Sequence, residues 1–162
     1  MAANVIQVGA VAPDFTLPSN QLTAEGKPGK PVTLSALRGK PVVLAFYPLD
    51  WSPVCSNEHS CFRSDVDAFD GIDAQVLGVS VDSVWSHKAF ADHLKVSYPL
   101  LADFNPRGAV AAQYGLYLED KGFDARATIV VDKAGKVAFV KVQDLGQARD
   151  NAEILAALKA LA

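Results

Sequence analysis

The sequence has 162 residues, of which 50% are hydrophobic, and a formal net charge of −3. A chain of this length buries one substantial core, so we expect a single domain over residues 1–162. Acidic and basic residues are interspersed, and no basic cluster could neutralise a run of phosphates. This pattern excludes a typical nucleic-acid-binding protein.

The sequence contains no apolar stretch near the roughly 20 residues that span a bilayer. Its first residues lack the charged and apolar regions of a signal peptide. We therefore expect a cytoplasmic protein without membrane association. The two cysteines, Cys55 and Cys61, are too few for a secreted disulfide scaffold, and in a reducing compartment they favour redox or nucleophilic chemistry.

Predicted strands and helices alternate along the chain. Residues 18–31 are polar and rich in Gly and Pro, which is typical of a surface loop or hairpin. Residues 41–47 (PVVLAFY) are apolar between turn signals, so we expect a central strand covered on both faces. Further strands are predicted at 74–81, 98–103, 125–132 and 136–142, and helices at 54–69, 83–94, 105–115 and 148–162. The last two strands flank a turn with Gly135 and form a hairpin, so the prediction is an α/β fold with a mixed sheet.

The predicted helix 54–69 contains both cysteines. Its apolar residues recur at threes and fours, and Cys61 is in phase with this stripe, whereas Cys55 lies in the first turn. Unpaired N–H groups and the positive end of the helix field lower the pKa of a thiol at such a position. Cys55 is therefore a candidate nucleophile. The alternative role is a small buried hydrophobe, which fits Cys61 better than Cys55.

Two other uses of the cysteines are less consistent with the spacing. A zinc site would combine Cys55 and Cys61 with His59, but no second Cys/His pair completes four ligands. A dithiol-exchange enzyme would carry C-x-x-C, whereas five residues separate these cysteines. We therefore expect neither a metal nor a bound cofactor, and we take His59, His87 and His93 as ordinary helix residues.

The segment PLDWSPVC, residues 48–55, resembles the P-x-x-x-T/S-x-x-C active-site motif of the peroxiredoxins, thiol peroxidases with a thioredoxin-like fold. The resemblance continues through VGAVAPDFTLP, GVSVDSVWSHKAFA, YPLLAD and RATIVVD, and the last of these contains Arg126. It implies a central mixed sheet flanked by helices. Ser52 stands where the motif also allows threonine. Serine keeps the hydroxyl of threonine but lacks its methyl group.

The resemblance also implies a reaction, the reduction of hydrogen peroxide or alkyl hydroperoxides by a thiol. Such a displacement needs a low-pKa thiol and donors aimed at the leaving oxygen. Cys55 would be the peroxidatic nucleophile, Arg126 would stabilise its thiolate, and the Ser52 hydroxyl would bind thiolate or peroxide. Pro48, which has no N–H, would shield the pocket from water. Glu58 would orient Arg126, although an acid early in a helix is also favoured by the helix dipole.

Each of the other matched residues has a commoner structural role as its alternative. Ser52 could cap the helix, Pro48 could end a strand, and Arg126 could be a surface cation. Their occurrence in order at matched positions favours the catalytic roles.

The second cysteine decides how the sulfenic acid formed at Cys55 is reduced. No cysteine follows Cys61, so the C-terminal resolving cysteine of the typical two-cysteine branch is lacking. In the bacterioferritin-comigratory branch the resolving cysteine lies five positions after the nucleophile, whereas Cys61 lies six after Cys55. Six helical steps separate the Cα atoms by roughly 9 Å, beyond the roughly 7 Å limit of a disulfide. The helix must therefore unwind before Cys61 condenses with Cys55.

Two alternatives stay open. The chain also resembles the alkyl hydroperoxide reductase E branch, in which one cysteine would suffice and Cys61 would be structural. The same scaffold could instead be a peroxide-sensing or chaperone-like redox module. For the enzyme, we expect a thioredoxin- or glutaredoxin-like reductant and a possible homodimer.

Overall fold

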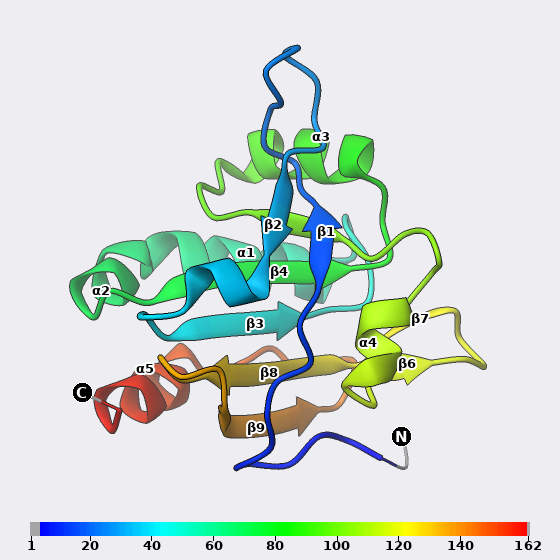
Figure 1. Cartoon of the computed structure of the whole chain (residues 1–162). Coiled ribbons are helices and arrows are strands. Elements are labelled where there is room, and N and C mark those ends of the chain that lie inside the picture. The colour runs from blue at the N-terminus through cyan, green and yellow to red at the C-terminus, as the bar shows by residue number, and fades with distance from the viewer. Residues whose placement is uncertain (1–3, 162) are drawn as a thin grey trace.

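The computed structural model describes residues 4–161, so residues 1–3 and 162 of the predicted domain lie outside the described part. Its centre is a five-stranded sheet in the order β5-β4-β3-β8-β9 (Figure 1). The strands are β3 (Val42–Phe46), β4 (Gln75–Ser80), β5 (Leu100–Ala102), β8 (Arg126–Val131) and β9 (Val137–Gln143). Strands β3, β4 and β5 are parallel, whereas β8 pairs antiparallel with both β3 and β9. The predicted mixed sheet with a central strand at 41–47 is confirmed.

The remaining elements surround this sheet. They are β1 (Thr16–Pro18), β2 (Pro31–Thr33), the 3-10 helix η1 (Leu34–Leu37), α1 (Pro53–Ser64), α2 (Val66–Gly71), α3 (Val84–Leu94), α4 (Ala109–Gln113), β6 (Tyr117–Leu118), β7 (Phe123–Asp124) and α5 (Asn151–Lys159). Strands β1 and β2 form a hairpin, as residues 18–31 allowed. The small β6–β7 hairpin was not predicted. Within residues 4–161, no helix is both long and apolar enough to cross a membrane.

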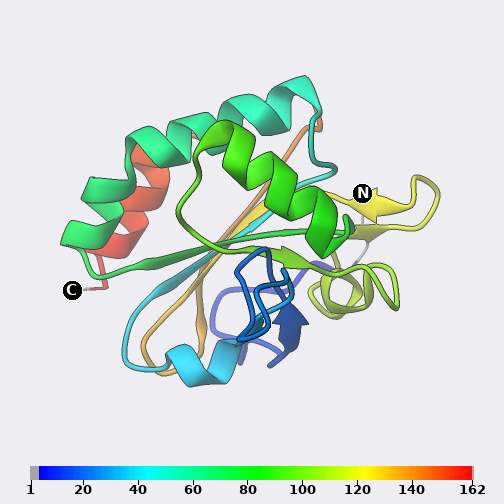
Figure 2. The same cartoon turned by 90° about the horizontal axis from the view of Figure 1, so that it is seen from above.

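Side chains of β3 alternate between two cores on opposite faces of the sheet. Leu44 and Phe46 belong to a core closed by the N-terminal segments and α4, and Val43, Ala45 and Tyr47 point into the other core. Figure 2 shows α1, α2, α3 and α5 on this second face. A strand that is buried on both faces is apolar throughout, which explains the continuous run PVVLAFY. The helix that contains both cysteines therefore shares a face with α3 and α5.

The predicted helix 54–69 is wrong in its length and in its buried face. The helix divides at Asp65, whose dihedral angles (φ −100°, ψ 7°) are not helical. The Asp65 carboxylate accepts a hydrogen bond from Asn151 of α5. The buried residues of α1 are Cys55, Glu58, His59 and Phe62. Cys61 lies outside this stripe and is exposed, which contradicts the alternative in which it is a small buried hydrophobe.

Gly78 of β4 lets α1 lie close to the sheet. A Cβ atom at this position would lie 2.6 Å from Leu100 Cδ2, 3.3 Å from His59 Cε1 and 3.4 Å from Tyr47 Cε1. Because these neighbours are buried, any larger residue would displace the Leu100 side chain and press on His59 of α1.

Candidate active site

The Cys55 thiol and the Arg126 guanidinium meet where β3 ends and β8 begins. Cys55 lies in the first turn of α1 and is fully buried, and Arg126 begins β8 with a side chain that is 2% exposed. Arg126 Nη2 lies 3.3 Å from Cys55 Sγ, and its Nε donates a hydrogen bond of 3.0 Å to the Leu145 carbonyl. Arg126 is therefore not the surface cation of the alternative interpretation. Its guanidinium is fixed with one edge against the sulfur.

Glu58 pairs with two arginines. One carboxylate oxygen accepts a hydrogen bond from Arg126 Nη1, and the other accepts one of 2.8 Å from the Arg149 backbone N–H. The second oxygen also lies 3.2 Å from Arg149 Nε, and the side chains of Glu58 and Arg149 are each 2% exposed. Glu58 lies beyond the first turn of α1, so an interaction with the helix terminus does not account for its place. The Glu58 carboxylate instead contacts and orients the guanidiniums of both arginines.

Arg149 is the residue of this site that the sequence did not reveal. It precedes α5, and its guanidinium donates hydrogen bonds to the carbonyls of Phe46 and Ala127 and to Thr128 Oγ1. Burial lowers the pKa of Arg149, and the Glu58 carboxylate opposes this shift. No local pattern marks an arginine before a helix as buried, because only the packing of α5 against β8 places it here. Two guanidiniums and one carboxylate leave a net positive charge beside the Cys55 sulfur.

Ser52 carries a hydroxyl without a partner. It occupies the N-cap position of α1, but its side chain makes no capping hydrogen bond, so the capping alternative is wrong. Its Oγ is buried and has no hydrogen-bond partner among the described residues. Pro48 lies just after β3 and is buried, and it brings no N–H to the same turn. The turn therefore offers one free donor and acceptor and no competing backbone donor at Pro48.

Cys61 is on the other side of the helix from Cys55. Six residues at 100° each turn the side chain by roughly 240°, and both thiols are free. A helix that is continuous from Pro53 to Ser64 keeps them apart. The structure thus does not bring this predicted resolving residue to the site.

The zinc alternative lacks support from the geometry. His59 Nδ1 lies 2.5 Å from the Tyr98 hydroxyl, and Cys61 points away from Cys55. Among the residues from 4 to 161, three potential ligand atoms come within 4.8 Å of one another at Asp50, Asp82 and His87, not at the cysteines.

A buried thiol held against a guanidinium at the end of the two middle strands of this mixed sheet defines a thiol-dependent oxidoreductase with a thioredoxin-like fold. The model of the AhpC/TSA family matches residues 8–140. The chain belongs to this family, which includes the peroxiredoxins, and it is a thiol-dependent peroxidase.

Individual relatives agree with this assignment. Alkyl hydroperoxide reductase E of Mycobacterium tuberculosis is 38% identical over 160 residues, which are 96% of this chain and 100% of the relative. The chloroplastic peroxiredoxin Q of Sedum lineare is 38% identical over 133 residues, or 82% of this chain and 67% of the relative. Among solved structures, AhpC of M. tuberculosis has a TM-score of 0.87 at 27% identity. The match covers 98% of this chain and 94% of the AhpC chain. Peroxidoxin BcpB of M. tuberculosis has a TM-score of 0.81 at 33% identity, and the match covers 97% of this chain and 99% of the BcpB chain.

Proposed function

We propose that Cys55 is the peroxidatic nucleophile and that it reduces hydrogen peroxide and alkyl hydroperoxides. The observation that carries the proposal is the distance of 3.3 Å between Arg126 Nη2 and Cys55 Sγ. The thiolate attacks one peroxide oxygen, an S–O bond forms and the O–O bond breaks. Cys55 becomes a sulfenic acid, and the leaving oxygen takes up a proton to become water or an alcohol.

The surrounding residues have separate tasks in this step. Arg126 stabilises the thiolate before attack and the negative charge that grows on the leaving oxygen. The Ser52 hydroxyl, which has no partner of its own, binds the peroxide, and Pro48 limits the access of water. Glu58 orients Arg126 by accepting a hydrogen bond from its Nη1.

For the second half of the cycle, we propose that Cys61 condenses with the sulfenic acid of Cys55 and releases water. The first turns of α1 must open for this, because the folded helix holds the two Cα atoms roughly 9 Å apart and turns the two side chains away from each other. A thioredoxin- or glutaredoxin-like dithiol then reduces the disulfide. This chemistry requires a supply of reduced thiols, which is consistent with action in the cytoplasm.

A one-cysteine cycle is the second candidate, and the exposure of Cys61 on the far face of α1 favours it. In this cycle an external thiol reduces the sulfenic acid directly, and Cys61 takes no part. Dimer formation stays a prediction in either case.

The first test is peroxide consumption in the presence of dithiothreitol, which reduces either oxidised form. Cys55→Ser should abolish consumption, because it removes the nucleophile, whereas Cys61→Ser should retain it. Consumption by Cys55→Ser at the wild-type rate contradicts the assignment of the nucleophile.

A further inference from the structure

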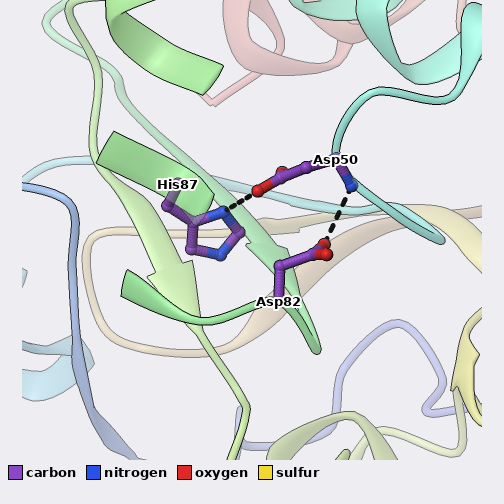
Figure 3. Close-up of side chains that lie close together, drawn as sticks. All are labelled: Asp50, Asp82 and His87. Carbon is purple, nitrogen blue, oxygen red and sulfur yellow. Dashed lines mark hydrogen bonds and ion pairs between the residues drawn. The ribbon is translucent and has the colours of Figure 1, made fainter. Parts of the chain in front are cut away.

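The turn between β3 and α1, residues 48–52, carries both Pro48 and Ser52. A cluster of buried Asp50 and His87 with half-buried Asp82 anchors it (Figure 3). Asp50 belongs to the turn, Asp82 follows β4, and His87 lies on α3. The cluster therefore joins the active-site turn to the strand and the helix beside it.

Asp50 is the centre of this cluster. Its carboxylate accepts hydrogen bonds from the Tyr47 hydroxyl at 2.7 Å, the Ser86 hydroxyl at 2.8 Å and His87 Nδ1 at 2.8 Å. Its backbone N–H donates to Asp82 at 2.8 Å. Burial raises the pKa of Asp50, but the hydrogen bond and the charge of His87 outweigh it, so the net pKa is lowered. Asp50 is an anion whose side chain and backbone are both fixed.

His87 uses both ring nitrogens as donors. Nδ1 faces the Asp50 carboxylate, and Nε2 lies 3.0 Å from the Leu101 carbonyl oxygen, which can only accept. The residue is fully buried, and its Nδ1 pairs with the Asp50 carboxylate out of contact with water. No lone pair is left on either nitrogen for a metal ion. The cluster is therefore an ion pair rather than a cation site.

Trp51 adds a second attachment of the turn to α3. Its φ of 72° lies in the left-handed region, which costs free energy for a residue other than glycine. Its ring centroid lies 5.1 Å from that of Phe90 and 5.4 Å from that of His93, both on α3. The hydrogen bonds of Asp50 and the ring contacts of Trp51 stabilise this unfavourable backbone conformation. The next residue is Ser52, whose hydroxyl has no partner.

We propose that Asp50 and His87 are positioning residues for peroxide reduction. Their contact fixes the turn that carries Ser52 and Pro48 and leads into Cys55, and no hydrogen bond of the described residues joins Asp50 or His87 to Cys55 itself. The inference rests on the proposed function of Cys55 as the nucleophile. It predicts that loss of the ion pair weakens the reaction with peroxide and leaves the general reactivity of the thiol in place.

Two reactions of Cys55 separate these effects, and both are measured in a Cys61→Ser background. Asp50→Asn should slow sulfenic acid formation with hydrogen peroxide by about 10- to 100-fold, since a misplacement near 1 Å can cost that much. Alkylation by iodoacetamide should stay within about twofold, because it depends on the thiolate and on the Arg126 contact, which the change does not touch. Asp92→Asn, an exposed aspartate of α3 that pairs with Lys88, is the matched control and should alter neither rate.

The single variant His87→Gln and the double variant Asp50→Asn/His87→Gln complete the experiment. The double variant should lose no more than the worse single one, because both remove the same ion pair. If Asp50→Asn does not fold, Ser86→Ala removes one donor to Asp50 and should slow the peroxide reaction selectively by a smaller factor.

The outcomes distinguish this inference from the function on which it rests. A wild-type protein that does not react with peroxide overturns the proposed function and this inference with it. A reactive wild type with an unchanged peroxide rate in Asp50→Asn overturns the inference alone. Parallel losses in peroxide reaction and alkylation also overturn it, since they indicate a merely structural role.

Discussion

Cys55 Sγ lies 3.3 Å from Arg126 Nη2, although 71 positions separate the two residues in the sequence. The sheet brings them together, because Phe46 at the end of β3 pairs with Ala127 near the start of β8. The turn after β3 leads directly into α1, and the residue before Ala127 is Arg126. The contact is therefore a direct consequence of antiparallel pairing between β3 and β8.

Replacement of this arginine tests its part in the reaction. Arg126→Gln should slow the reaction of Cys55 with hydrogen peroxide by about 100- to 1,000-fold, the usual cost of one lost transition-state donor. Stopped-flow or quench-flow measurement of sulfenic acid formation gives the rate. Arg63→Gln, at an exposed arginine of α1, is the control and should react normally. A rate for Arg126→Gln within threefold of wild type contradicts this role.

Glu58→Gln should lower stability as well as activity. The change leaves the two buried guanidiniums of Arg126 and Arg149 without their carboxylate, and an uncompensated buried charge typically costs about 3–5 kcal/mol. Urea denaturation at pH 7 measures the free energy of unfolding. Glu153→Gln, which removes a partly exposed pair with Lys141, should cost at most about 1 kcal/mol. Equal stabilities of the two variants would show that Glu58 does not balance the arginines.

Much of the fold follows from local patterns in the sequence. The apolar run at 41–47 predicts a central strand, and the turn with Gly135 predicts the final hairpin, because burial and turn chemistry are local properties. The helical periodicity downstream of Pro53 placed Cys55 correctly in the first turn of α1.

The errors arise where tertiary contacts override these patterns. The apolar stripe that included Cys61 assumed one uninterrupted helix, whereas the buried face of α1 contains Glu58 and His59, whose polar side chains find partners inside. Arg149 and the Asp50–His87 pair were missed because each residue comes from a different element. Only the completed fold turns such separate polar residues into a cluster.

The fate of the sulfenic acid is predicted to depend on Cys61. After one equivalent of peroxide, peptide mapping of the wild type should find an intrachain disulfide between Cys55 and Cys61. Cys61→Ser should keep the first reaction with peroxide and lose turnover with thioredoxin, since it lacks the thiol that forms the disulfide. A persistent sulfenic acid in the wild type contradicts the resolving role and supports the one-cysteine cycle.

His59 should make the fold sensitive to acid. Burial, with a smaller effect of the Arg149 charge, lowers the pKa of His59 from 6.5 to about 3. Between these values the unfolded chain binds a proton that the folded protein does not, so stability is complete above pH 6.5 and is lost as the pH falls. The loss from this group between pH 7.5 and pH 5 should be about 2 kcal/mol.

Urea denaturation at these two pH values measures the effect. His59→Gln should remove this part of the pH dependence, whereas His93→Gln, at an exposed histidine of α3, should retain it. An identical pH dependence in His59→Gln and the wild type would assign the loss to other groups.

The most direct test of the account is the second-order rate constant of the reduced wild-type protein with hydrogen peroxide, compared with that of a free cysteine thiolate at the same pH. An active site in which Arg126 and Ser52 act on the bound peroxide predicts a rate at least about 1,000-fold above the free thiolate. It also predicts that Cys55→Ser shows no such reaction. A wild-type rate no greater than that of the free thiolate would contradict the proposal that Cys55 is the nucleophile of a peroxidase.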